Sequence, residues 1–152
     1  MSYRIGSGTY GYVYISEWNK TKCAEKKIPA HHLDGIDFSS VRECTYLQRL
    51  NHPRIIKPLA VDMTFDGNLS IYMPLMYKDL HKWIDNALDN ERERLFFKIF
   101  YPLTHALKYI HDNHILHRDI KPSNILLDEK LDAYFIDFGT SRELDLYDRM
   151  VN

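Results

Sequence analysis

The chain has 152 residues, of which 45% are hydrophobic and 27% are charged, and its formal net charge at pH 7 is −1. This composition is that of one ordinary globular domain and excludes disordered, fibrous and membrane-embedded chains. A net charge near zero gives no general attraction to nucleic acid or to anionic membranes, so we expect neither as a partner.

The first part of the chain predicts antiparallel strands interrupted by one helix. Short β-prone runs cover Tyr3–Ile5, Tyr12–Ser16 and Thr21–Ile28, and glycine-bearing or polar turns separate them. Apolar residues then recur at helical spacing, which predicts a helix over Ser39–Leu50. We therefore expect a β-rich unit that contains a single helix.

A second strand pair and a longer helix are expected next. The strands are predicted over Ile55–Met63 and Leu69–Met73. Apolar residues on one face predict a helix over Arg94–His111, and Pro102 is expected to bend or locally break it.

Two short apolar strands, Ile125–Leu127 and Ala133–Ile136, are expected near the end of the chain, between loops rich in charged and polar residues. Such loops usually hold chemistry. The one compositional shift along the chain, at about Pro74–Asp79, predicts a hinge between a β-rich lobe and a helical lobe.

The sequence lacks features that would indicate a membrane-spanning, secreted or disulfide-bonded protein. No apolar run approaches the roughly 18 residues of a spanning helix, and the first ten residues lack the apolar core of a signal peptide. We expect an intracellular protein, cytoplasmic or nuclear. Cys23 and Cys44 have no CxxC spacing, which favours reduced thiols over a disulfide or structural zinc.

Residues 6–11, Gly-Ser-Gly-Thr-Tyr-Gly, have the spacing of a phosphate-binding glycine loop. Positions without side chains let backbone N–H groups approach a polyphosphate closely. The pattern alone is weak, because it also occurs by chance in glycine-bearing turns. It continues into a β-prone run instead of a helix, which disfavours a dinucleotide-binding Rossmann unit.

A lysine and a glutamate downstream of this loop form a second candidate group. Strand alternation places Ala24 and Lys26 on one face, where the lysine could meet phosphate oxygens. A single strand lysine is more often solvated, and Lys27 competes for the role. Glu43 on the following helix could hold Lys26 extended through a charge-assisted hydrogen bond; taken singly, it is a surface glutamate.

The most specific pattern is the string at residues 117–127, HRDIKPSNILL, followed by Asp137-Phe138-Gly139. Asp119, Asn124 and Asp137 supply the oxygen-rich set that Mg²⁺ prefers, and Lys121 can offset phosphate charge. Chance assembly of the whole string is negligible.

These motifs, in this order, resemble the eukaryotic protein kinase family, and the likeness runs from Ile5 to about Arg142. The resemblance implies an α+β, two-lobe kinase fold. It places a β-rich N-lobe with one helix at residues 1–73, a hinge at 74–78, and the first part of a helical C-lobe at 79–152, ending in the activation segment.

The resemblance also implies a site for ATP and Mg²⁺ and a protein substrate. Its ATP-binding positions are Ile5, Gly6, Gly8, Gly11, Val13, Ala24, Lys26, the gatekeeper Met73, the hinge residues Leu75 and Met76, and Leu126. Lys26, braced by Glu43, would hold the α- and β-phosphates. Asn124 and Asp137 would hold Mg²⁺.

The same resemblance implies that the loop at residues 117–124 carries out catalysis. Asp119 would accept or orient the proton of the substrate hydroxyl, and Lys121 would neutralise the γ-phosphate. Lys121 is also typical of serine/threonine specificity. Leu47, His117 and Phe138 would stack as an apolar spine.

Within the family, the glycine loop and Val41-Arg42-Glu43 look most like cyclin-dependent kinases. Thr9 and Tyr10 resemble an inhibitory phosphorylation pair, and the helix that bears Glu43 resembles the contact for a cyclin-like activator. The matching regulatory arginines, which gather around a phosphothreonine in that subfamily, are Arg42, Arg118 and Arg142. The alternative is that they are three unrelated surface arginines.

The segment after Gly139 departs from the family pattern, because it is short and contains no APE motif. We therefore expect a C-terminally truncated kinase. The alternative to an active serine/threonine kinase is an inactive remnant that acts as a nucleotide-, cyclin- or scaffold-binding module.

Overall fold

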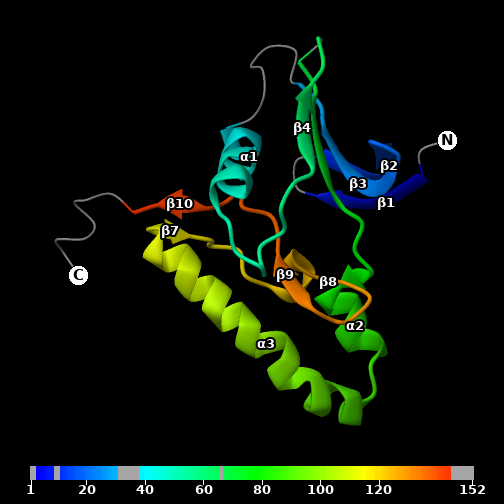
Figure 1. The fold of residues 1–152 in the computed structure, drawn as a ribbon, viewed down its shortest axis with the longest axis vertical. Helices are drawn as coiled ribbons and strands as arrows, with labels where there is room; N and C mark the ends of the chain where they lie inside the picture. Colours follow the sequence, from blue (N-terminus) through cyan, green and yellow to red (C-terminus); the bar gives the residue numbers. More distant parts are fainter. Residues whose placement is uncertain (1–2, 9–10, 31–37, 66, 145–152) are drawn as a thin grey trace.

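A computed structural model of the chain describes residues 3–8, 11–30, 38–65 and 67–144. Its upper part in Figure 1 is an antiparallel five-stranded sheet with one helix, α1 (Phe38–Arg49), beside it. The strands lie in the order β1 (Tyr3–Gly8), β2 (Gly11–Trp18), β3 (Thr21–Ile28), β5 (Leu69–Pro74) and β4 (Ala60–Met63).

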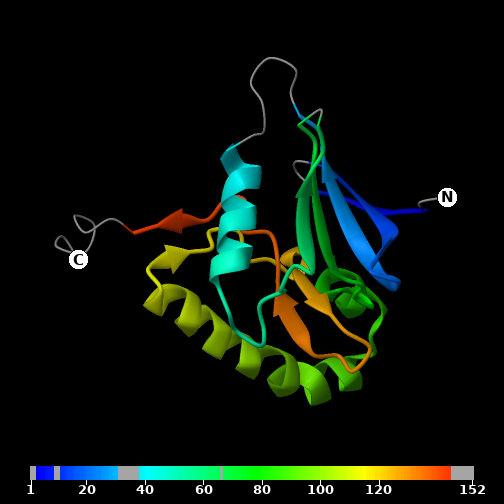
Figure 2. The same ribbon diagram turned by 45° about the horizontal axis from the view of Figure 1, so that its top comes forward.

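The lower part is built from two helices and short strands (Figures 1 and 2). The helices are α2 (Leu80–Asn86) and α3 (Asp89–Asp112), and a 3₁₀ turn covers Pro122–Asn124. The short strands are β6 (Lys78–Asp79), β7 (Ile115–Leu116), β8 (Ile125–Leu127), β9 (Ala133–Phe135) and β10 (Arg142–Glu143). They form a β6–β8–β9 sheet and a β7–β10 pair, which confirms the expected α+β kinase fold.

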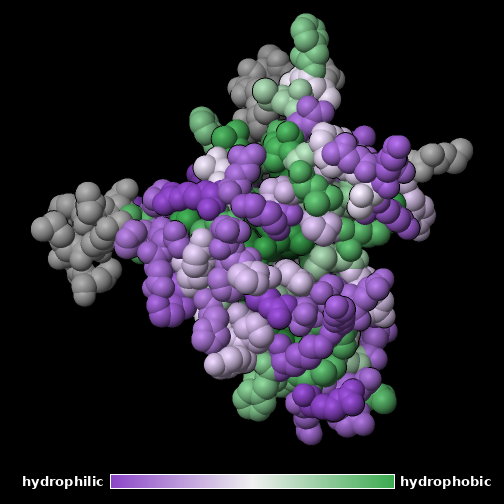
Figure 3. All heavy atoms as spheres, viewed as in Figure 1, coloured by the Kyte–Doolittle hydropathy of each residue, from purple (hydrophilic) through white to green (hydrophobic). Residues whose placement is uncertain are grey.

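The main core joins the two parts. Its fully buried members include Leu47 on α1, Ile110 on α3, Leu127 on β8 and Phe138 beyond β9. A smaller cluster between α1 and the sheet includes Ile71. On the face shown in Figure 3, apolar residues gather near the middle, between the more hydrophilic surfaces of the upper and lower parts.

The predicted strand over Ile55–Met63 is wrong in its first half. Only Ala60–Met63 joins the five-stranded sheet, whereas Ile55 forms an isolated parallel bridge with Phe135 of β9. Pro58 interrupts the run, because proline has no N–H for a sheet ladder. The segment consequently pairs first with the lower part and then with the upper one.

Of the two expected effects of Pro102, a bend or a local break, the break does not occur, since α3 runs without interruption from Asp89 to Asp112. Ile99, Leu103 and Ala106 on its inner face are at most 4% exposed. Burial of this face offsets the cost of the missing hydrogen bond, as is usual for helices that tertiary packing stabilises.

The sequence-based expectations omit helix α2, although Leu80, Trp83 and Ile84 have the i, i+3, i+4 spacing of a helix and pack in or on the main core. A second readable signal is Asp79, whose carboxylate accepts a hydrogen bond from the backbone N–H of Lys82 at 2.8 Å. With only seven residues, the helix shows this spacing over a single turn. Among the described residues, no helix is both long and apolar enough to cross a membrane.

Candidate active site

Lys26 of β3 and Glu43 of α1 form a buried ion pair, with Lys26 Nζ 2.5 Å from Glu43 Oε2. Their side chains are only 7% and 3% exposed. Burial raises the pKa of the Glu43 carboxyl, and the attraction of Lys26 opposes that rise. Lys27, by contrast, is half exposed and lies 3.5 Å from Glu25 on the other face of the strand, so Lys26 is the lysine that α1 braces.

The sheet register brings further predicted nucleotide-binding residues to the same face as Lys26. Val13 of β2 lies directly opposite Lys26, and Met73 of β5 lies directly opposite Ala24. Because opposed residues share a face and alternate residues along a strand do too, these four side chains form one surface of the sheet.

The glycine loop is the hairpin between β1 and β2, in which Gly8 pairs with Gly11. Gly11 has a packing reason to be glycine, because a Cβ there would lie 2.2 Å from the carbonyl oxygen of Lys27. A Cβ at Gly6 would make only an ordinary contact with Val13. Thr9 and Tyr10, the predicted phosphorylation pair, lie outside the described residues.

The expected hinge residues follow β5, with Leu75 exposed and Met76 half-buried. A cleft of about 640 Å³ borders them, and its other walls come from residues 51–53 and 55–57 and from Pro74, Asp128 and Tyr134. None of Lys26, Asp119, Asn124 or Asp137 lines this cleft, so it borders the predicted hinge and not the groups predicted to handle phosphate and metal.

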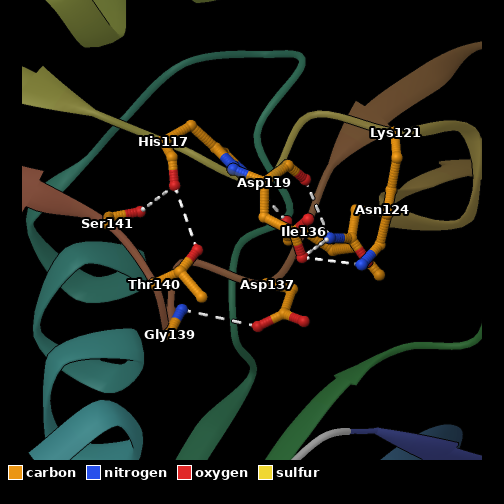
Figure 4. A network of polar contacts seen from close by, with 9 residues as sticks. All are labelled: His117, Asp119, Lys121, Asn124, Ile136, Asp137, Gly139, Thr140 and Ser141. Atoms are coloured by element: carbon orange, nitrogen blue, oxygen red, sulfur yellow. Dashed lines mark hydrogen bonds and ion pairs between the residues drawn. The ribbon is translucent and has the colours of Figure 1, made fainter.

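Asp119, Lys121 and Asn124 converge in the loop between β7 and β8 (Figure 4). Lys121 Nζ donates to Asp119 Oδ2 at 2.8 Å, and Asn124 Nδ2 donates to the same oxygen at 2.8 Å and to the Asp119 carbonyl at 2.9 Å. The hydrogen bond from Lys121 lowers the pKa of Asp119, so the carboxylate stays charged and able to accept a hydrogen bond.

Asp137 follows β9 and stands close to this loop. The backbone N–H of Ile136 donates to the Asn124 carbonyl at 3.2 Å. In Figure 4 the Asp137 carboxylate points toward the backbone N–H of Gly139, which donates to Asp137 Oδ1 at 3.4 Å. Asp137 has φ +61° and Arg118 has φ +66°, both in the left-handed region that favours glycine. Such strain persists only where surrounding contacts hold it.

The predicted apolar spine is present as a set of buried contacts. The rings of His117 and Phe138 have centroids 4.7 Å apart, and Phe138 belongs to the same core cluster as Leu47. Burial lowers the pKa of His117, whose Nε2 lies 2.9 Å from the carbonyl oxygen of Ile136. The spine therefore fixes the catalytic loop against the segment that bears Asp137.

Two of the three predicted regulatory arginines contact backbone carbonyls just after Asp137. Arg42 Nη1 donates to Gly139 O at 3.2 Å, and Arg118 Nε donates to Thr140 O at 2.6 Å. Arg142 is exposed on β10.

Sequence reasoning missed the contacts of Thr140 and Ser141 with His117 O and the ion pair between Arg49 and Glu143. No spacing signal marks them, because their partners lie 23 to 94 residues away.

Comparison with known proteins places this geometry in a family. The profile of the protein kinase domain matches residues 1–151. Over 139 residues the chain is 34% identical to the "Probable CTD kinase subunit alpha homolog" of Encephalitozoon cuniculi (strain GB-M1), a match that covers 91% of this chain and 41% of that protein. The chain thus spans about two fifths of the length of this relative. On these grounds, the chain belongs to the eukaryotic-type protein kinase family.

Proposed function

We propose that this chain binds ATP with Mg²⁺ and transfers the γ-phosphate to serine or threonine hydroxyls of protein substrates. The observation that carries the proposal is the buried Lys26–Glu43 pair, present together with the Asp119–Lys121–Asn124 cluster in one structure. In this proposal the sheet surface of Val13 and Ala24 covers the adenine, and Lys26 holds the α- and β-phosphates.

Asn124 and Asp137 are the proposed magnesium ligands. The amide nitrogen of Asn124 is committed to Asp119, which leaves its oxygen as the group to offer a cation. Two protein oxygens leave most of an octahedral shell to phosphate oxygens and water, as is usual for Mg²⁺ in phosphoryl transfer. When bound, the ion would neutralise phosphate charge and orient the γ-phosphate.

Asp119 and Lys121 have the proposed chemical roles. The Asp119 carboxylate accepts the proton of the substrate hydroxyl while the hydroxyl oxygen bonds to the γ-phosphorus. The bond from that phosphorus to the β–γ bridging oxygen breaks, and ADP leaves. In this structure Lys121 is hydrogen-bonded to Asp119, and its side chain is 50% exposed. In the proposal its ammonium group turns from Asp119 toward the γ-phosphate when ATP is bound.

The outer face of α1 supports a further proposal, a cyclin-like activator as partner. Phe38 is 85% exposed and Val41 is 49% exposed on the helix that carries Glu43. Exposed apolar side chains on a functional helix fit a protein contact that would hold Glu43 against Lys26. The relative's printed name, a kinase subunit, agrees with an assembly of more than one chain.

The proposed lobe boundaries are residues 1–73 for the N-lobe, 74–78 for the hinge and 79–152 for the C-lobe. Strand β5 ends at Pro74, and β6, the first element of the lower part, begins at Lys78. These limits support a short connector that joins the two parts at the nucleotide site.

Thermal unfolding with and without ADP and Mg²⁺ tests the nucleotide half of the proposal, because a ligand that binds only the folded state raises the midpoint. We expect a magnesium-dependent rise for the unmodified chain and none for Asp137→Asn. Asp112→Asn, at the exposed end of α3, is the matched control and should keep the rise. Absence of any rise in the unmodified chain would contradict the proposed site.

A further inference from the structure

The segment Gly139–Ser141, immediately after Asp137, is held from three directions. Arg42 of α1 donates to the carbonyl of Gly139, and Arg118 of the catalytic loop donates to the carbonyl of Thr140. The hydroxyls of this segment are themselves donors to the catalytic loop. Thr140 Oγ1 donates to His117 O at 3.2 Å, and Ser141 Oγ donates to the same oxygen at 3.3 Å (Figure 4). We call this pair of hydrogen bonds the hydroxyl clamp.

The hydroxyl clamp joins two strained points of the backbone. Its acceptor, His117 O, belongs to the peptide that leads into Arg118, which has φ +66°. Its donors lie three and four residues after Asp137, which has φ +61°. A non-glycine residue in this region is costly and needs contacts that over-determine it. The two hydrogen bonds of the clamp fix the peptide plane between His117 and Arg118. They therefore restrain the backbone both next to Arg118 and in the segment that follows Asp137.

The clamp adds to the other contacts that hold this part of the chain. The short ladder of β7 and β10 pairs Leu116 with Arg142, and it begins just after Ser141. Between that ladder and Asp137, the Phe138 ring packs on His117, and the hydroxyls of Thr140 and Ser141 add side-chain hydrogen bonds to the catalytic loop. Ser141 is fully buried and Thr140 is half-buried, so water competes little for these bonds.

We infer that Thr140 and Ser141 are positioning residues for phosphoryl transfer, whose hydroxyls on His117 O hold the Asp137 segment against the catalytic loop and so set Asp137 relative to Asn124. The inference rests on the proposed function, because Asp137 and Asn124 are the proposed magnesium ligands. The two hydroxyls act on the reaction only through these ligands and touch neither substrate nor cofactor.

Sharing one acceptor makes the two bonds partly redundant. Removal of one hydroxyl leaves the other donor on His117 O, so each single loss has a small effect. Removal of both leaves a buried carbonyl that has lost its two side-chain donors, and the segment is then held to the loop more loosely, through Arg118 on Thr140 O and Phe138 on His117. The combined effect on magnesium-dependent binding should therefore exceed the product of the single effects.

Calorimetric titration of the full chain with ADP, in excess Mg²⁺ and in EDTA, measures what the clamp is inferred to control. The variants are Thr140→Val, Ser141→Ala and the double variant, which change shape little while removing hydroxyls. Thr140→Ser keeps the hydroxyl and should keep the unmodified behaviour. Thr104→Val is the matched control, because it removes an exposed threonine hydroxyl that also bonds a backbone carbonyl, at 2.7 Å on α3.

For the double variant we expect ADP affinity in EDTA within about twofold of the unmodified chain, and a magnesium-dependent gain in affinity reduced about tenfold, of the order that lost hydrogen bonds produce. Thr140→Val alone should reduce that gain about two- to threefold, which keeps the test available if the double variant does not fold. A folded double variant with an unchanged magnesium gain overturns the inference. Equal weakening with and without Mg²⁺ also overturns it, since that result marks a purely structural role.

The unmodified chain separates this inference from the proposed function. If it shows no gain in ADP affinity with Mg²⁺, the proposed function itself is wrong and the inference falls with it. If it shows the gain, the proposed metal site stands, and the variants alone decide whether the hydroxyl clamp sets it.

Discussion

Arg42 and Glu43 are consecutive residues of α1 that hold two different parts of the candidate active site. Glu43 Oε2 lies 2.5 Å from Lys26 Nζ in the sheet, and Arg42 Nη1 donates to the carbonyl of Gly139 at 3.2 Å, just after Asp137. One turn of helix thus joins the proposed phosphate-binding lysine to the proposed metal-binding segment. A shift of α1 must disturb both contacts together.

Removing one partner of the buried ion pair between Lys26 and Glu43 should lower the stability of the fold. Lys26→Met leaves the Glu43 carboxylate buried without its cation, and we expect the free energy of unfolding to fall by about 3–5 kcal/mol. Urea denaturation measures it. Lys22→Met is the matched control at an exposed position of the same strand and should change stability by less than about 1 kcal/mol. A loss for Lys26→Met no larger than that of the control would show that the pair is not buried as described.

Leu47 on α1 is fully buried in the core shared with Phe138. Leu47→Ala should lower the free energy of unfolding by about 2–5 kcal/mol, through lost apolar burial and a cavity. The neighbouring Gln48 is exposed, and Gln48→Ala should stay within about 0.5 kcal/mol of the unmodified chain. Similar denaturation midpoints for the two variants would contradict the described core.

The charge of Asp119 should persist to lower pH than that of an ordinary aspartate, because the hydrogen bond from Lys121 lowers its pKa. A folded-state pKa below the unfolded one means that this contribution to stability is present above the unfolded pKa and is lost as pH falls through the folded pKa. Lys121→Met should move the Asp119 midpoint upward, toward the ordinary aspartate value. Carbon NMR titration of the Asp119 carboxyl measures the shift, and an unchanged midpoint would refute the role of Lys121.

The Arg49–Glu143 pair is exposed, with three nitrogen–oxygen contacts at 3.1 Å between α1 and β10. We expect Glu143→Gln to cost at most about 1 kcal/mol, and less at high salt, because water and ions screen such pairs. Exchanging the two charges, with Arg49→Glu and Glu143→Arg, should recover part of the loss. A large loss of stability for Glu143→Gln that does not depend on salt would contradict this expectation, because an exposed ion pair cannot contribute that much to the free energy of unfolding.

Local motifs made much of the fold predictable. β-prone runs bounded by turn residues predict β2, β3 and β5, helical spacing predicts α1, and the strict spacing from His117 to Gly139 indicates the family. What was missed depends on distant partners or short elements. Ile55 pairs with Phe135, and α2 is only seven residues long.

Long-range side-chain contacts could not be predicted from the sequence either. The hydroxyl clamp on His117 O and the pair of Arg49 with Glu143 form only when the chain has folded, and no local period records them. At Pro102 the helix is not broken, because burial of the inner face of α3 outweighs one lost hydrogen bond.

Transfer of labelled γ-phosphate from ATP to a peptide with separate serine, threonine and tyrosine residues tests the central claim most directly. The account predicts magnesium-dependent label on serine or threonine and none on tyrosine, with the label lost in Asp119→Asn and retained in Asp112→Asn. Label transfer that survives Asp119→Asn, or nucleotide binding by the unmodified chain with no label transferred, would contradict it.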